Sequence, residues 1–174
     1  GIVGGSGMNK ESEIEILKSR KIIGSVVDSL NLTMLYFTEG RIKRSELYRG
    51  KPINVVWSAL LDGEIAQTKN PSLVLAIVSG EAFELKDADQ NTLGSYGFNE
   101  EVTLNGVRFK VQKTADFDFK ETQTIYVSSL ERKAVISSYR AGLAVNAVDK
   151  KSSVLKLSFT HPVKQKAEDF LNEL

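Results

Sequence analysis

The chain contains no cysteine and only one histidine, His161, among its 174 residues. The absence of cysteine excludes structural disulfides and thiolate metal sites without fixing a cellular compartment. A single histidine excludes metal sites built on several imidazoles. The sequence offers His161 no positioned partner for general-base chemistry, and its place before Pro162 is typical of a helix start. We therefore predict no catalytic residue, no metal ligand and no cofactor-binding residue.

Long apolar runs and an excess of one charge are also missing. The longest uninterrupted apolar run covers residues 73–78, far short of the roughly 20 residues that cross a bilayer as a helix. The 23 Lys and Arg residues balance 22 Asp and Glu residues, which gives a net charge of +1. No field of the whole domain attracts polyanions, so nucleic acid is not an expected partner.

The composition is that of one globular domain. Hydrophobic residues make up 41% and charged residues 26% of the chain, which allows a sizeable buried core at this length. The glycine-rich residues 1–7 lack the Gly-Lys-Ser/Thr ending of a phosphate loop and no strand precedes them. Residues 1–10 are therefore interpreted as a flexible linker or expression remnant, and residues 11–174 as the folded domain.

Three helices are predicted from capping and periodicity. Ser12 and Glu15 form a capping box that opens a helix ending near Asn31. Ser128 and Glu131 form a second box, opening a helix that ends near Gly142. Pro162 suits the first position of a third helix, which is amphipathic up to the last residue.

Between and after these helices the pattern is that of short strands. Asn105 and Gly106 supply the positive φ angles of a tight turn and predict a hairpin over residues 101–113. The other strands are expected at residues 34–37, 53–57, 73–78, 83–85, 124–127, 143–148 and 154–160. The predicted fold class is α+β, with one core in which a mixed sheet packs with the helices and a C-terminal β-α-β-β-α portion.

The clearest local charge bias follows residue 40. Five cations, Arg41, Lys43, Arg44, Arg49 and Lys51, stand against the lone acid Glu46. They suit contact with a glycan, with phosphates or with another subunit, and a solvated loop is the structural alternative. Trp57 closes an apolar run and is interpreted as core rather than as a sugar-stacking platform. The acids around Asp87 lack the Gly and terminal Glu of a calcium loop and indicate a solvated turn.

Residues 11–32, ESEIEILKSRKIIGSVVDSLNL, resemble the first periplasmic helix of the polysaccharide co-polymerases, or chain-length determinants (the Wzz/Wzc type). The likeness lies in a Glu-rich start, the Lys-Ser-Arg centre and the Asp-x-Leu-x-Leu ending formed by Asp28, Leu30 and Leu32. Residues 48–55, residues 83–87 and residues 154–174 are similar to later family segments. The resemblance covers most of the chain from Glu11.

This resemblance implies a non-catalytic assembly domain on the periplasmic face of the bacterial inner membrane. The domain would be anchored by membrane helices outside this sequence and would regulate the chain length and export of capsular, exo- or O-antigen polysaccharide. It implies a homo-oligomer of the full-length membrane form, working with the polysaccharide polymerase and export machinery and contacting polysaccharide. Glu15, Lys18 and Arg20 are predicted subunit contacts. The subgroup it most resembles carries a cytoplasmic tyrosine kinase domain, and nothing in these residues shows one.

Two other classes of function remain open. A periplasmic glycan-binding module would be favoured by convergent polar and aromatic side chains in a pocket. A carboxylate glycosidase would need two acids held roughly 5 to 9.5 Å apart in a cleft, which spacing in a sequence does not reveal. A lone protomer is expected to be monomeric in dilute solution, because a contact patch below roughly 1,000 Å² binds weakly.

Overall fold

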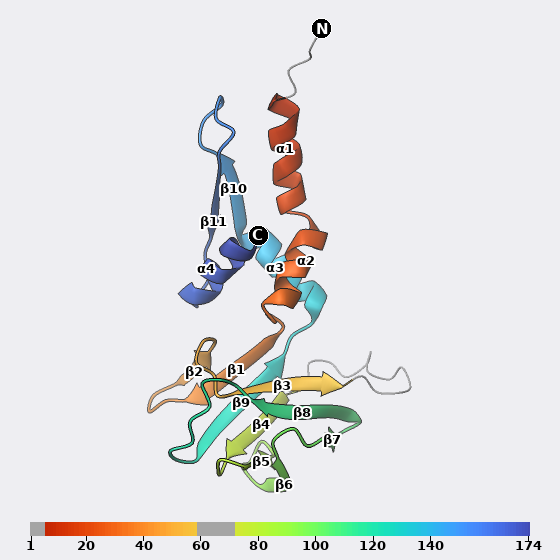
Figure 1. The fold of residues 1–174 in the computed structure, drawn as a ribbon, viewed down its shortest axis with the longest axis vertical. Coiled ribbons are helices and arrows are strands. Elements are labelled where there is room, and N and C mark those ends of the chain that lie inside the picture. The colour runs from red at the N-terminus through yellow and green to blue at the C-terminus, as the bar shows by residue number, and fades with distance from the viewer. Residues whose placement is uncertain (1–5, 59–71) are drawn as a thin grey trace. The chain divides into compact units, whose positions relative to one another are not determined.

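The computed structural model describes residues 6–58 and 72–174, with helices α1 to α4 and strands β1 to β11 (Figure 1). These residues form two compact units. The first contains the described residues up to Thr33 together with Glu131–Leu174, and the second is Met34–Leu130. The α+β class is confirmed. The expectation of one core is wrong, because the strands of Met34–Leu130 form a compact unit of their own.

The first unit is mainly helical. Its elements are α1 (Ser6–Leu17), α2 (Arg20–Ser29), α3 (Arg132–Gly142), β10 (Leu143–Ala147), β11 (Leu155–Phe159) and α4 (Lys164–Glu173). The helices α2, α3 and α4 supply most of its core, which holds Ile23, Val27, Ile136, Tyr139 and Phe170 at low exposure. In Figure 1 the β10–β11 hairpin runs beside α1, and these two elements are in contact.

The second unit is all β. Its strands are β1 (Met34–Glu39), β2 (Arg44–Leu47), β3 (Ile53–Ser58), β4 (Ser72–Ile77), β5 (Ala82–Lys86), β6 (Thr92–Gly97), β7 (Val102–Leu104), β8 (Val107–Lys113) and β9 (Gln123–Ser129). They form a six-stranded sheet in the order β2-β1-β9-β4-β5-β6 and a three-stranded sheet in the order β3-β8-β7. Inward side chains of both sheets share one core, which includes Phe83, Phe109 and Ile125.

The predicted mixed sheet is not found. Every strand pairing in the described part of the chain is antiparallel. The expected β-α-β-β-α order does occur as β9, α3, β10, β11 and α4. However, β9 lies at the centre of the six-stranded sheet of the second unit, whereas the four later elements belong to the first unit. Neighbours in sequence are therefore divided between two cores.

Two helix starts differ from the predicted ones. Ser12 lies inside α1, which begins at Ser6, so residues 6–10 of the expected linker are helical; residues 1–5 lie outside the described residues. Ser128 and Ser129 lie in β9, where they pair with β4 and β1, so they do not open α3. The N-cap of α3 is Glu131, without a side-chain capping bond. Ladder pairing has overridden the second capping box as a start signal, and the first box lies within a helix that begins six residues earlier.

Pro162 lies just before the third predicted helix rather than at its first position. Helix α4 begins at Lys164, with Val163 as its N-cap residue. The amide of Val163 donates a hydrogen bond of 2.9 Å to Nδ1 of His161. The single histidine thus holds the turn that leads into α4, close to the helix-start position expected for it.

The predicted Asn-Gly hairpin is confirmed as β7–β8. Leu104 pairs with Val107 across a two-residue turn in which Asn105 has a φ of 49° and Gly106 a φ of 79°. Two successive positive φ angles define the type I′ turn that matches the twist of paired strands. Strands β2 and β6 were not predicted, because neither shows a run of β-branched or aromatic residues.

We expect Gly106→Ala to destabilise the second unit by about 1–2 kcal/mol, since a Cβ makes the left-handed conformation unfavourable. Space is not the reason, because no atom lies within 4 Å of the added Cβ. Gly80→Ala is the matched control: its Cβ also meets nothing within 4 Å, and its φ is not in the positive range. Urea unfolding followed by Trp57 fluorescence measures both changes, and equal losses would contradict the turn assignment.

Candidate functional site

The Lys18-Ser19-Arg20 motif lies at a break between two helices. Helix α1 ends at Leu17 and α2 begins at Arg20, so Lys18 and Ser19 form an elbow instead of continuing one helix to Asn31. The Ser19 hydroxyl accepts a hydrogen bond of 3.3 Å from the amide of Ile22 and caps α2. The Lys18 carbonyl accepts a bond of 2.8 Å from Nε of Arg140 on α3. A serine cap and a distant arginine together stabilise the break.

Polar bonds continue along the contact between α2 and α3. The Arg20 guanidinium donates a hydrogen bond of 2.8 Å to the Ser137 hydroxyl. Further along, Arg132 donates to both carboxylate oxygens of Asp28, at 2.8 and 2.9 Å. Gly24 leaves room for this pair, because a Cβ there would lie 2.8 Å from Nη2 of Arg132. The two helices are therefore joined at both ends of their contact.

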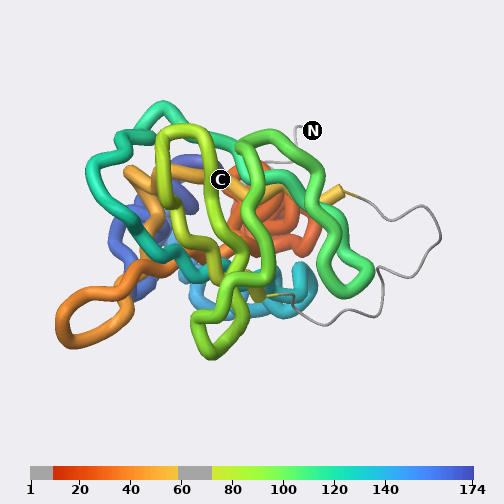
Figure 2. Tube along the Cα trace, turned by 90° about the horizontal axis from the view of Figure 1, so that it is seen from below, coloured from red at the N-terminus to blue at the C-terminus, as the bar shows by residue number. Residues whose placement is uncertain are grey.

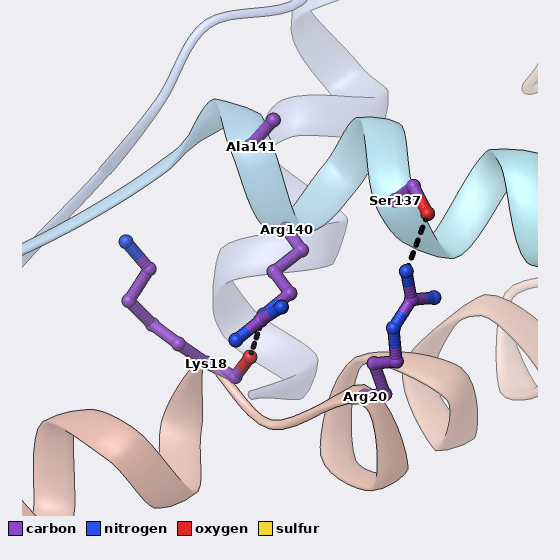
Figure 3. Close-up of a pocket in the computed structure, with 5 residues that line it drawn as sticks. All are labelled: Lys18, Arg20, Ser137, Arg140 and Ala141. Carbon is purple, nitrogen blue, oxygen red and sulfur yellow. Dashed lines mark hydrogen bonds between the residues drawn. The ribbon is translucent and has the colours of Figure 1, made fainter.

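A pocket of about 340 Å³ opens at the elbow. Its lining residues are Lys18, Arg20, Ser137, Arg140 and Ala141, which Figure 3 draws as sticks. The three cations form no ion pair with any carboxylate that the structure describes. We call this the elbow pocket. It contains two of the three residues predicted as subunit contacts; the third, Glu15, is exposed on α1 and does not line it.

The Asp28–Arg132 pair predicts a small dependence of stability on pH. Hydrogen bonds from Arg132 hold the pKa of Asp28 below its usual 3.8. A lowered pKa in the folded state means that the stabilisation is present above pH 3.8 and is lost as the pH falls below that value. Both side chains are more than half exposed, at 53% and 57%. We therefore expect Asp28→Asn to cost no more than about 1 kcal/mol at neutral pH.

Amide hydrogen exchange in α2 and α3 at pH 7 and below pH 3 measures this effect. Glu13→Gln is the control, because Glu13 is exposed on α1 and has no ion pair in the described part of the chain. The Asp28→Asn variant and the unmodified chain should differ at pH 7 and converge in acid. A difference that persists in acid would show that the hydrogen-bond geometry, not the charge, accounts for the loss.

The predicted basic segment lies on and around the β1–β2 hairpin. Its cations differ in their surroundings, since some pack on tyrosine rings and others are exposed. The Arg44 guanidinium carbon lies 3.6 Å from the centre of the Tyr126 ring, and its Nε is 3.9 Å from Glu39. The Lys51 ammonium lies 4.9 Å from the centre of the Tyr36 ring. These two cations therefore pack on tyrosines of the sheet. Arg49 is exposed but also has an interaction partner.

The tip of the β1–β2 hairpin carries the other two cations. Arg41 and Lys43 are exposed there and flank Ile42, which is 97% exposed. Figure 2 shows this loop, in orange, projecting away from the strands of the second unit. The structure thus leaves Arg41 and Lys43 as the members of the basic segment that are open to contact with a partner.

A second concavity lies in the all-β unit. It measures about 660 Å³ and is lined by Glu81, Gly97, Phe98, Asn99, Gln112 and Lys113. The Lys113 ammonium lies 3.4 Å from the Glu81 carboxylate and 5.1 Å from the centre of the Phe98 ring. We call this the sandwich cleft. It brings a carboxylate, two amides, an ammonium and an aromatic ring to one surface.

The remaining residues that the sequence singled out have structural roles. Trp57 packs on Phe109 with ring centres 5.5 Å apart, and its indole nitrogen lies 3.0 Å from the sulfur of Met34. The Asp87 carboxylate accepts hydrogen bonds from the amides of Asp89 and Asn91 within the β5–β6 turn.

Within residues 6–58 and 72–174, no cluster of three or more His, Asp or Glu side chains is arranged to hold a metal ion. None of the described helices has the length and apolar character needed to cross a membrane.

Comparison with known proteins does not assign the chain to a family. No family model matches the chain, and no curated protein matches it. Two crystal structures of FlgL from Xanthomonas campestris, in space groups H3 and C2, are similar to it with 12% and 11% identity and a TM-score of 0.27 each. The similarity covers 81% of this chain, which spans 42% of the FlgL chain. A likeness at this TM-score carries no argument about function.

Sequence reasoning missed Ser137 and Arg140. They are three residues apart on α3 and so lie on the same side of the helix. That spacing is a signal for a shared surface. It does not reveal that the surface faces the Lys18–Ser19 elbow, since more than 110 residues separate the two segments in the sequence.

Proposed function

We propose that this chain is a non-catalytic assembly domain of a polysaccharide co-polymerase, which regulates the chain length and export of a capsular, exo- or O-antigen polysaccharide. One observation carries the proposal. The residues behind the family resemblance act together in the first unit: Ser19 caps α2, the Lys18 carbonyl binds Arg140, and Asp28 binds Arg132. A motif whose members have joint structural roles is better support than scattered identities.

The proposal places the domain on the periplasmic face of the bacterial inner membrane, anchored by membrane helices carried elsewhere in the protein. The full-length membrane form is then a homo-oligomer that works beside the polymerase and export machinery. Glu15 on α1, Lys18 and Arg20 at the elbow, and the exposed hairpin residues Arg41 and Lys43 are its candidate contacts with another subunit or with the polysaccharide. Because these charged side chains are exposed or, for Lys18, half-buried, they suit contacts whose combined binding strength increases with the number of subunits in the oligomer.

A genetic experiment tests this function. An in-frame deletion of residues 11–174 in the source bacterium should change the length distribution of the surface polysaccharide on a gel without abolishing sugar polymerisation. Restoring the intact gene should restore the distribution. An unchanged distribution would contradict the proposal, provided that immunoblotting shows that the intact protein is normally present.

The sandwich cleft favours a second candidate, a glycan-binding module. Amides and carboxylates bind sugar hydroxyls, and an aromatic ring such as Phe98 packs on a sugar face. Here we expect oligosaccharides of the native polysaccharide to shift the amide resonances of Asn99 and Gln112. The Gln112→Ala variant should weaken binding, while Gln165→Ala, exposed on α4 in the first unit, should not. Equal affinity in both variants would contradict this candidate.

A further inference from the structure

The elbow pocket concentrates positive charge without neutralising it. The Lys18 ammonium makes no hydrogen bond or ion pair with any described residue. Arg20 donates one N–H to the Ser137 hydroxyl, and Arg140 donates one N–H to the Lys18 carbonyl. Both acceptors are uncharged oxygens. Each guanidinium carries five N–H donors, so both retain donors for another partner. The residues that line the pocket therefore carry three positive charges and several unused donors.

We propose that the elbow pocket binds a phosphate-type oxyanion, with diphosphate as the form that fits best, through Lys18, Arg20, Arg140 and the hydroxyl of Ser137. This proposal goes beyond the proposed assembly function, although Lys18 and Arg20 are also predicted subunit contacts. Neither the cleft of the all-β unit nor the basic hairpin contributes to it.

The two arginines are held in place before any ligand binds. Arg20 is fixed by its bond to the Ser137 oxygen, and Arg140 by its bond to the Lys18 carbonyl, both at 2.8 Å (Figure 3). A planar guanidinium presents paired donors that match phosphate oxygens. The Ser137 oxygen accepts from Arg20, so its own proton remains available to donate. Less side-chain freedom is then lost on binding.

Charge favours diphosphate among oxyanions, and the pocket is large enough to hold it. A single carboxylate would neutralise one of the three cations, whereas a diphosphate carries enough negative charge to balance all of them. The volume of about 340 Å³ falls within the range of about 300–1,000 Å³ found for small-molecule sites. Helix α2 begins at Arg20, so the partial positive charge of its N-terminus adds to the attraction.

The same chemistry is presented by a soluble diphosphate and by the phosphate headgroup of a lipid. Two arms of one experiment separate these sources. In the first, inorganic pyrophosphate and inorganic phosphate are titrated into the ¹⁵N-labelled chain and followed by NMR. In the second, the chain is floated with phosphatidylcholine vesicles with and without phosphatidic acid. Binding of pyrophosphate or phosphate without binding to the vesicles assigns a soluble ligand. Binding in both arms assigns a lipid headgroup, whose phosphate chemistry the pocket also binds as a free ion.

We expect pyrophosphate to shift the amides of Ser19, Arg20 and Ser137 most and to bind more tightly than phosphate. Lys18→Gln should weaken pyrophosphate binding about fivefold, because it removes one exposed charge pair. Its fold should be unaffected, since the Lys18 side chain has no partner among the described residues. Arg20→Gln should weaken binding about tenfold, because it also removes a charged fork.

Lys156→Gln is the matched control: Lys156 is exposed on β11 of the same unit, outside the pocket, and the change removes the same charge. This variant should keep the affinity of the unmodified chain. Equal weakening by Lys18→Gln and Lys156→Gln would overturn the proposal, because it would reduce the effect to general charge. Shifts centred away from α2 and α3, or no saturable binding in either arm, would overturn it as well.

Discussion

Replacing Phe170 with alanine is expected to destabilise the helical unit by about 3–5 kcal/mol, the usual cost of emptying a buried phenylalanine site. Phe170 is 0% exposed on α4. Its ring centre lies 4.9 Å from that of Tyr139 and 4.7 Å from that of Phe159. The change leaves a cavity between α3, α4 and the β10–β11 hairpin and removes two aromatic contacts.

Two probes report on the two units separately. Hydrogen exchange of α2 and α3 amides reports on the helical unit, and fluorescence of Trp57 reports on the all-β unit. The Phe170→Ala variant should accelerate exchange in α2 and α3 and leave the urea midpoint of Trp57 in place. Phe119→Ala is the control for the same chemical change at a site that is already 37% exposed. A Trp57 midpoint that falls in parallel would contradict separate cores.

Removing one hydroxyl from Tyr36 is expected to destabilise the all-β unit by about 1–3 kcal/mol, because it leaves a buried amide without an acceptor. The Tyr36 hydroxyl accepts a hydrogen bond of 2.8 Å from the amide of Val55. Tyr36 belongs to the six-stranded sheet and Val55 to the three-stranded one, so the bond joins the two sheets. Tyr36→Phe keeps the ring, so the loss measures this bond rather than a cavity.

The same variant carries a pH signature. Burial raises the pKa of Tyr36 above its usual 10.0, against a weaker opposing effect of the Val55 hydrogen bond. A raised pKa in the folded state means that the stabilisation is complete below pH 10 and is lost as the pH rises above that value. The stability gap between the unmodified chain and Tyr36→Phe should therefore narrow in alkali.

Urea titrations at pH 7 and above pH 10 measure this gap. Tyr96→Phe is the control, because the Tyr96 hydroxyl has no hydrogen bond to any described residue. Its effect should be small at both pH values. If Tyr36→Phe lowers the free energy of unfolding as little as Tyr96→Phe does, the Val55 amide finds another acceptor, such as water.

Local pattern was sufficient for most strands and for the presence of the last two helices, but not for their first residues. Alternating apolar residues predicted β3, β8 and β11 within one or two residues, and Asn105-Gly106 predicted the β7–β8 turn. These features depend on side-chain period and on backbone sterics, which act over a few residues. Gly142 likewise ends α3 where the sequence placed the end.

Capping patterns predicted two helix starts that the structure does not have. The pattern at Ser12 predicts a helix start, yet α1 runs through it, and Ser19, seven residues later, is the serine that caps a helix. The box at Ser128 predicts a helix start, yet pairing with β1 and β4 extends the strand through Ser129. A capping box gives a modest local preference, and sheet pairing on both sides of a strand exceeds it.

The sequence by itself determined the α+β class, most of the elements, the hairpin turn and the surplus of cations after residue 40. Tertiary structure alone decided the division into two cores, the pairing of Arg44 and Lys51 with tyrosines, and the meeting of Lys18 and Arg20 with Arg140. The physical reason is range. Helix and strand patterns follow from neighbours within a few residues, whereas a pocket depends on which distant surfaces bury one another, and many pairings satisfy the same local pattern.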